Sequence, residues 1–336
     1  VVSLLLLACR MQATFGEATT SAIIAAVLRH TTEKNVIFSP LLLTESLRQM
    51  NLAAEGKTAE EIAKVLHLTG KASSEILEDF SNATGLANIS ETQNLHFANR
   101  LFLAFDIKLL PEYQQKESEM FANQSQSVNF ANSSETINKI NTWLADASNN
   151  TITKLVENVA AETKALSLGA IYFKGFWKYA FDSQNTSKAK FQIPQKSGQA
   201  RKIDVDMMFR KALCRLNEID KLDAMSLEIP YDDTELSLVV LLPKTVNGID
   251  KIINNLDQMD SADISPKTPA MYVQVYLPKF KLDVELTLNE ALKSLGLVQI
   301  FQKANFSAMT DSQADLKLDR ILQKSIVEVA EEGSSA

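Results

Sequence analysis

The sequence predicts an α+β fold. Apolar residues recur at helical spacing through the first part of the chain, and later segments mix helical patterns with β-rich apolar runs. Strict alternation of strands and helices is absent, which argues against a doubly wound parallel sheet. The chain has 336 residues, 46% of them hydrophobic, enough for a large core. No linker-like stretch or internal repeat divides it, so we expect a single domain over residues 19–336.

Helices are predicted first along the chain. Residues 19–31 carry apolar side chains at helical spacing. Ser39 is the predicted N-cap of a second helix, with Pro40 at its first position. Thr58 is predicted to cap a third helix, with Glu61 as its capping-box partner.

Strands and further helices follow in the remaining chain. The segment 237–242 is an uninterrupted apolar run, as expected for a strand buried on both faces. Gly296 is expected to stop the last helix. The remaining predicted elements are helices over 74–86 and 287–295 and strands over 95–105 and 165–172.

The first nine residues are apolar and precede Arg10. This run is too short to span a bilayer. We interpret it as the hydrophobic core of a signal peptide, so that residues 1–18 are a signal-peptide remnant and lead. The alternative is a buried N-terminal strand. Once a signal is removed, Cys214 is the one cysteine left, which leaves no intrachain disulfide and predicts a buried, inert thiol.

Seven Asn-x-Ser/Thr sequons occur in the chain. Together with the signal-like start, they predict a secreted, extracellular glycoprotein. A sequon at Asn305 sits beside Phe306 in an apolar setting and is not expected to be used. The six candidates for glycosylation are Asn82, Asn88, Asn123, Asn132, Asn149 and Asn185.

Charge and composition exclude several classes of function. The net charge is −7 and the pI is about 5.2, so nucleic acid and anionic membrane surfaces are poor partners. No zinc-binding, phosphate-binding or nucleophile-elbow motif is present, so we predict no catalytic residues, no metal and no cofactor. The acid pairs Asp204 with Asp206 and Asp232 with Asp233 are better explained by strand edges and turns.

The end of the chain is the most informative segment. Residues 325–330 alternate like a strand with one buried face. Two acids follow, then a glycine, whose backbone reaches angles that other residues avoid, and then three small residues. Such a segment can hinge and slide between strands of a sheet. The predicted hinge consists of Glu331, Glu332, Gly333, Ser334, Ser335 and Ala336.

This hinge resembles the start of the reactive loop in the serpin family. Further family-like motifs occur in the family's order from about residue 20 to the end. They are residues 35–40, 53–62, 99–102, 140–143, 170–177, 229–231, 241–243, 277–280 and 305–307.

The resemblance implies a fold of about nine helices around three β-sheets, with a large central sheet that accepts the reactive loop as an extra strand. It implies a serine-type endopeptidase inhibitor that acts as a suicide substrate, traps its protease as a covalent acyl-enzyme and is itself not an enzyme. The implied partner is a serine protease, or a cysteine protease, and the protein is expected to be a monomer. The alternative is a non-inhibitory serpin that serves as a secreted carrier, storage or signalling protein.

The resemblance also implies a loop-entry region at Gly169, Trp177 and Gln323. The family usually has Asn where this chain has Gly169, and His where it has Gln323. Some serpins bind heparin through a basic helix, which corresponds here to residues 74–88. That segment contains acids but no Lys or Arg, so heparin is not expected to be a partner. We expect the chain to stop before the scissile bond and the C-terminal strands, as a fragment or as half of a cleaved molecule.

Overall fold

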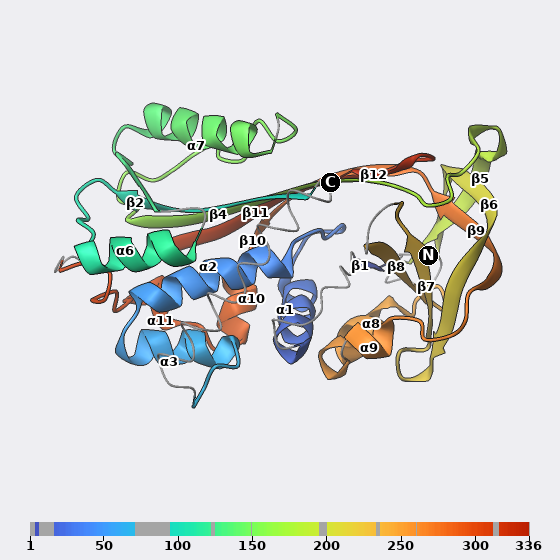
Figure 1. Cartoon of the computed structure of the whole chain (residues 1–336), viewed down its shortest axis with the longest axis horizontal. Helices are drawn as coiled ribbons and strands as arrows, with labels where there is room; N and C mark the ends of the chain where they lie inside the picture. Colours follow the sequence, from blue (N-terminus) through green and yellow to red (C-terminus); the bar gives the residue numbers. More distant parts are fainter. Residues whose placement is uncertain are drawn as a thin grey trace. The chain divides into compact units, whose positions relative to one another are not determined.

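The computed structural model forms two compact units (Figure 1). The larger unit contains residues 14–173 and 283–326, and the smaller unit contains residues 1–13, 174–282 and 327–336. The predicted helix over 74–86 lies outside the residues that the structure describes. The structure describes residues 4–6, 17–70, 95–121, 125–148, 150–194, 200–232, 236–259, 261–311 and 316–335.

The first predicted helices and the late one are confirmed, with small shifts at their ends. Seven of the α-helices in the described ranges belong to the larger unit and two to the smaller. In the larger unit they are α1 (Glu17–His30), α2 (Pro40–Ala53), α3 (Gly56–Val65), α6 (Pro111–Met120), α7 (Ser133–Ala147), α10 (Asn289–Ser294) and α11 (Gln299–Gln302). In the smaller unit they are α8 (Ile249–Asn255) and α9 (Ser261–Ile264).

Helix caps show one correct prediction and one wrong one. The Ser39 hydroxyl accepts a hydrogen bond from the Leu42 amide, as predicted for the N-cap of α2. The capping box at Thr58 and Glu61 is wrong, because α3 begins earlier and both residues lie inside it. The Glu61 carboxylate instead accepts from the amides of residues 298 and 299 and so caps α11, which is distant in sequence.

The predicted strands are confirmed, and further strands complete two six-stranded sheets. One sheet has the order β10-β11-β12-β4-β2-β3, and the other β1-β8-β7-β6-β5 with β9 also paired to β6. The strands are β1 (Leu4–Leu6), β2 (Leu95–Ala104), β3 (Gln126–Val128), β4 (Ala165–Phe176), β5 (Ser187–Ile193), β6 (Arg201–Ile219), β7 (Ala224–Pro230), β8 (Ser237–Pro243), β9 (Met271–Pro278), β10 (Phe280–Thr287), β11 (Leu318–Val329) and β12 (Gly333–Ser335).

The larger unit is built on the first sheet. Within this unit β4 is antiparallel to β2 and parallel to β11. Helix α7 covers one face of the sheet and α2 lies on the other (Figure 1). Phe102 of β2 and Trp143 of α7 pack edge to face with ring centroids 5.4 Å apart. Two strands of this sheet, β4 and β11, continue along the chain into the smaller unit.

The smaller unit is built on the long strand β6. Its first part pairs with β5 and β9, and its last part pairs with β7. The acid pair is structural, as expected, because Asp204 and Asp206 form cross-strand ion pairs of 2.8 Å with Lys190 and Lys188. Cys214 is a buried free cysteine, also as expected, and burial raises the pKa of its thiol.

The N-terminal apolar run contains a strand. Residues 4–6 form β1, which pairs antiparallel with residues 239–241 of β8. This is the alternative that the sequence left open beside the signal peptide. Among the described helices, none combines the length and the apolar character needed to cross a bilayer.

Candidate functional site

The predicted hinge forms a short strand between the ends of two longer ones. After β11 ends at Val329, the chain turns, and the Ala330 amide donates to the Gly333 carbonyl at 3.0 Å. Strand β12 then runs antiparallel to β11 on one side and to β4 on the other. The start of the hinge is therefore already a strand of the sheet, paired along both edges. Ala336 lies outside the described residues.

The turn before β12 is held by hydrogen bonds from the segment that follows β4. The Trp177 amide donates to the Glu332 carbonyl, and the Phe181 amide donates to the Glu331 carbonyl, each at 2.9 Å. The Trp177 indole N–H donates to the Ala330 carbonyl, also at 2.9 Å. Each of these three consecutive carbonyls thus has a donor, which fixes the backbone where the loop leaves β11.

Glu331 anchors the turn through its side chain as well. One carboxylate oxygen accepts from the Thr186 hydroxyl at 3.0 Å, and the other pairs with the Lys279 amine at 2.8 Å. The hydrogen bond from Lys279 lowers the pKa of the Glu331 carboxyl below its ordinary 4.5 and raises the pKa of Lys279. Glu332 is exposed and contributes to the turn through its backbone carbonyl.

This pair makes the hinge sensitive to acid. Because the folded pKa of Glu331 is depressed, the contact is fully present at neutral pH and is lost as pH falls below 4.5 through the lowered value. We expect the turn to loosen over that range. Fluorescence of Trp177 in a Trp143→Phe protein would report it, since Trp177 is buried against the turn. Glu331→Gln is the control, because that variant should lack this step; an identical acid transition in both proteins would contradict the prediction.

Gly333 is required for space, and the structure corrects the reason expected for it. Its φ angle is not among the positive values found at other glycines. A Cβ on Gly333 would instead collide with the Gly175 carbonyl oxygen and lie 2.8 Å from the Phe176 Cα. Strand β12 fits against β4 because this position has no side chain.

Ser334 is the buried residue of the hinge. Its side chain is 3% exposed, and it lies opposite Val329 of β11 and Gly175 of β4. It contacts Tyr231, which stacks on Trp177 with centroids 4.7 Å apart and an interplanar angle of 9°. Burial raises the pKa of the Tyr231 hydroxyl. A small polar side chain fits this place, and a large or charged one does not.

The structure places the three predicted loop-entry residues in two groups. Gly169 of β4 and Gln323 of β11 are register partners in the larger unit. The Gln323 amide is buried, accepts from the Ser39 backbone N–H at 2.9 Å and donates to the Ser39 carbonyl at 3.1 Å. A Cβ at Gly169 would meet Gln323 and Leu42 at ordinary contact distances. Trp177 belongs to the smaller unit and binds the hinge directly.

Sequence reasoning gave no role to two residues that hold the hinge. Lys279 and Tyr231 lie in motifs that carried the family resemblance, but neither was assigned to the hinge. The motifs marked their positions, and only the folded chain shows that they meet residues 331 and 334.

Most of the glycosylation candidates cannot be placed. Asn132 is described, and its side chain caps α7 by accepting from the Glu135 amide. Asn185 lies in a short 3-10 helix, Ser183–Asn185. The candidates outside the described residues are Asn82, Asn88, Asn123 and Asn149.

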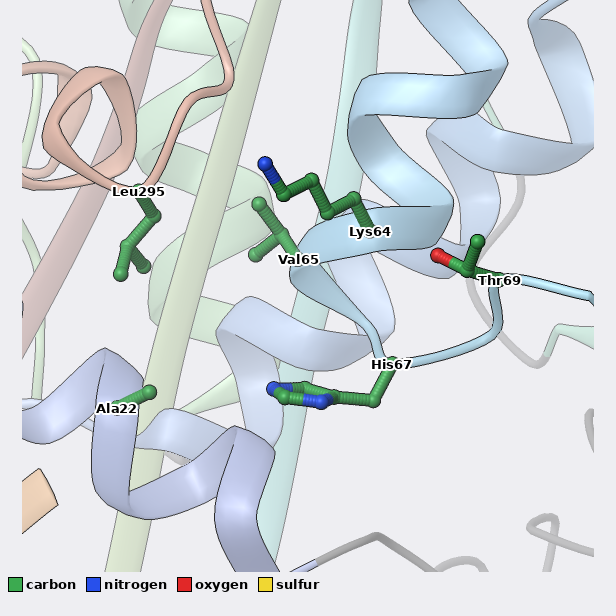
Figure 2. A pocket seen from close by; sticks show the side chains of 6 residues that line it. All are labelled: Ala22, Lys64, Val65, His67, Thr69 and Leu295. Carbon is green, nitrogen blue, oxygen red and sulfur yellow. The ribbon is translucent and has the colours of Figure 1, made fainter. Parts of the chain in front are cut away.

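A pocket in the larger unit is separate from the hinge residues. It has a volume of about 470 Å³. Its lining residues belong to α1, to α3, and to the two segments that follow α3 and α10. Figure 2 shows the apolar side chains of Val65 and Leu295 on its wall, with Lys64 and His67 nearby. Ala22 and Thr69 complete the lining. None of these residues contributes to the hinge, so the pocket has no part in the site.

Comparisons with protein families, with known proteins and with solved structures all point to one family. A family model described as "Serpin (serine protease inhibitor)" matches residues 17–336. Leukocyte elastase inhibitor of Xenopus tropicalis is 31% identical, over 90% of this chain and 81% of that protein. Human serpin B9 is 33% identical over the same shares. Among solved structures, "Cleaved Serpin 42Da" matches with a TM-score of 0.85 and 29% identity, over 96% of this chain and 88% of that one.

These relatives correct the prediction of a secreted glycoprotein. Leukocyte elastase inhibitor and serpins B3, B6 and B9 are clade B serpins, a group of intracellular proteins that lack a signal peptide. The predictions of secretion, a signal peptide, an extracellular location and glycosylation are therefore wrong. The physical reason is that an apolar run of nine residues suits a strand such as β1 as well as it suits a signal core.

Proposed function

Because this chain belongs to the serpin family and is a serine protease inhibitor, we propose that its inhibitory insertion begins at β12. The observation that supports this is the pairing of Gly333–Ser335 with β11 on one edge and β4 on the other. A loop that is already seated as a strand at its first residues needs no separate nucleation step. Each following residue extends pairing that is already in place.

The mechanism is that of a suicide substrate. The serine of the protease attacks the loop and forms an acyl-enzyme. The freed loop then extends β12 between β4 and β11, which pair directly with each other over residues 165–171 and 318–325. One ladder of backbone hydrogen bonds is lost, and the inserted strand makes two. This gain drives insertion, which distorts the protease before it completes deacylation.

The loop-entry pair is where the two strands must separate. Because residue 169 is a glycine, β4 has no side chain at this point. The oxygen and the nitrogen of the Gln323 side-chain amide both bond to the backbone of Ser39, which links β11 to the start of α2. Opening the sheet must therefore either break the two hydrogen bonds between Gln323 and Ser39 or move Ser39 together with β11. We assign Gln323 the role of holding β11 until insertion begins.

The proposed target is a serine protease of the elastase type. The relatives that support this carry the name leukocyte elastase inhibitor, in Xenopus tropicalis and in other species. The protein itself performs no catalysis in this scheme, because the nucleophile belongs to the protease. It needs no cofactor and no heparin, and it acts as a monomer.

The test is formation of a covalent complex. The full-length protein is mixed with leukocyte elastase and resolved under denaturing conditions. We expect a band that contains both proteins and resists SDS, because the acyl bond is retained. In parallel, cutting the loop with a non-target protease should raise the melting temperature, because insertion adds a strand to the sheet.

A matched control separates trapping from simple cleavage. Elastase whose active-site serine is replaced by alanine should give no SDS-resistant band. Loop cleavage without any complex, and without a rise in melting temperature, would show that the chain does not insert its loop.

A further inference from the structure

The pocket in the larger unit has walls that the fold holds in place. Residues of α1 and α3 form two of them, and Leu295, at the end of α10, belongs to a third (Figure 2). The Glu61 carboxylate of α3 accepts from the amides of residues 298 and 299, which ties α3 to the segment after α10. Helix α1 packs against α10. The pocket is therefore formed by the fold itself, and its volume of about 470 Å³ suits a small molecule.

Two helices that border the pocket end in the same motif. At the end of α3, the His67 amide donates to the Lys64 carbonyl at 3.2 Å. The Leu68 amide donates to the Ala63 carbonyl at 2.8 Å. This pair of bonds is the Schellman motif, whose central residue is left-handed and is usually glycine. Helix α10 ends in the same way and has Gly296 at that position, with a φ angle of 96°.

In α3 the left-handed position is occupied by His67. Its φ angle is 54°, a backbone conformation that is unfavourable for a residue with a side chain. A glycine would end the helix at a lower cost, as Gly296 does in α10. Strained residues of this kind gather at functional sites. In Figure 2 the His67 ring extends across the pocket toward Ala22, so the strained backbone places an imidazole in the pocket.

The polar groups of the pocket are hydrogen-bond donors. They are the Lys64 amine, the His67 ring and the Thr69 hydroxyl, and the lining contains no acidic residue. Within the described ranges, the side chains of Lys64 and His67 have neither an ion pair nor a hydrogen bond. The other lysine of α3, Lys57, lies 4.0 Å from the Glu61 carboxylate. The pocket therefore holds a positive charge without a counterion, on a chain whose net charge is −7.

The rest of the lining is apolar. Val65 is 7% exposed, and Leu295 and Ala22 are half-buried. An apolar wall beside an amine and an imidazole matches a ligand with an apolar body and one anionic head. One carboxylate can accept from the Lys64 amine and from a ring N–H of His67 together. A polyanion would need a larger cluster of cations than this pocket has.

We propose that this pocket binds a small amphipathic carboxylate. Its head lies between Lys64 and His67, and its apolar body lies against Val65 and Leu295. The strained backbone of His67 is retained because its ring completes the site for the head. This proposal does not rest on the inhibitory function, and it involves no residue of the hinge.

The test uses octanoate as the probe. Acetate has the same head without the body, and octan-1-ol has the body without the charged head. Calorimetric titration of the full-length protein should show binding of octanoate, and each of the other two probes should bind at least roughly tenfold more weakly. Among the chain's three histidines, octanoate should shift the ring proton signal of His67 alone.

Three variants locate the binding. Lys64→Gln should weaken octanoate binding about tenfold, since it removes a charged hydrogen bond. Lys57→Gln is the matched control, because this lysine is on the same helix, is exposed and does not line the pocket; its affinity should stay within about twofold. His67→Gly should also weaken binding about tenfold. It should not lower the melting temperature of the free protein, because glycine favours the left-handed position.

Several outcomes would overturn the proposal. No binding of octanoate would do so directly. Equal affinity in the unaltered protein, Lys64→Gln and His67→Gly would show adventitious binding elsewhere on the chain. Octan-1-ol that binds as tightly as octanoate would show that no head-group site exists. A lower melting temperature of His67→Gly with unchanged affinity would assign His67 to the end of α3 alone. Complex formation with elastase tests the proposed function separately, so either proposal can fail without the other.

Discussion

Replacing Ser334 by arginine is expected to turn this inhibitor into a substrate. The Ser334 side chain is 3% exposed and lies against Tyr231, which stacks on Trp177. An arginine here would bury a charge with no partner, at a cost of about 3 kcal/mol or more. The variant avoids this cost in the starting state by leaving residues 333–335 out of the sheet, so that the arginine must be buried during insertion. That step then slows by a factor on the order of 100. Deacylation then wins, and the protease is released.

The experiment measures complex and cleaved product together. Full-length Ser334→Arg is mixed with leukocyte elastase, and we expect the loop to be cut with little or no SDS-resistant complex. Ser335→Arg is the matched control, because Ser335 is less buried and, by strand alternation, points to the other side of β12. It should keep most of the complex. An undiminished complex in Ser334→Arg would refute the assignment of the hinge.

Replacing Gly333 by valine is expected to expel β12 from the sheet. Any Cβ at this position meets the backbone of Gly175 and Phe176, neither of which can move without disturbing β4. Overpacking of this kind costs about 1–3 kcal/mol. The chain avoids part of that cost by giving up the pairing of residues 333–335. The hinge would then no longer start as a strand, and less of the protease would be trapped.

Two measurements test the Gly333→Val variant. Amide exchange at residues 333–335 should speed up at least about tenfold, the factor that 1.4 kcal/mol of lost protection corresponds to. The yield of covalent complex with elastase should fall. For the exchange measurement Gly169→Ala is the control, because its Cβ would meet its neighbours at 3.5 Å or more, an ordinary contact. Unchanged exchange in Gly333→Val would show that the close approach to β4 is not limiting.

Local signals in the sequence were sufficient for much of the fold. Helix periodicity located α1 and α2, the Ser39–Pro40 pair located the start of α2, and the apolar run 237–242 located β8. These features depend on residues within a few positions of each other. For the same reason the small residues after Glu332 were enough to predict a hinge, since its size requirement can be read from the residues themselves.

Partnerships between distant residues could not be read in this way. Glu61 looked like the capping partner of Thr58 but caps α11 instead, because its carboxylate reaches amides that the fold brings close. The apolar N-terminus had the composition of a signal core, yet residues 4–6 pair with β8. In both cases the local pattern was compatible with two structures, and a distant segment selected one.

For the hinge, too, the sequence determines some properties and the folded structure determines others. Its residues, the order of its acids and small side chains, and the family that it resembles are all contained in residues 325–336. Its geometry depends on distant residues. Gly333 is needed because Gly175 is close, and Glu331 is held because Lys279 lies beside it. Ser334 is buried where β12 lies between β11 and β4. The composition of a segment follows from the chain. What that segment contacts follows only from the packing of strands far apart in sequence, where hydrogen bonds and excluded volume act between neighbours in space.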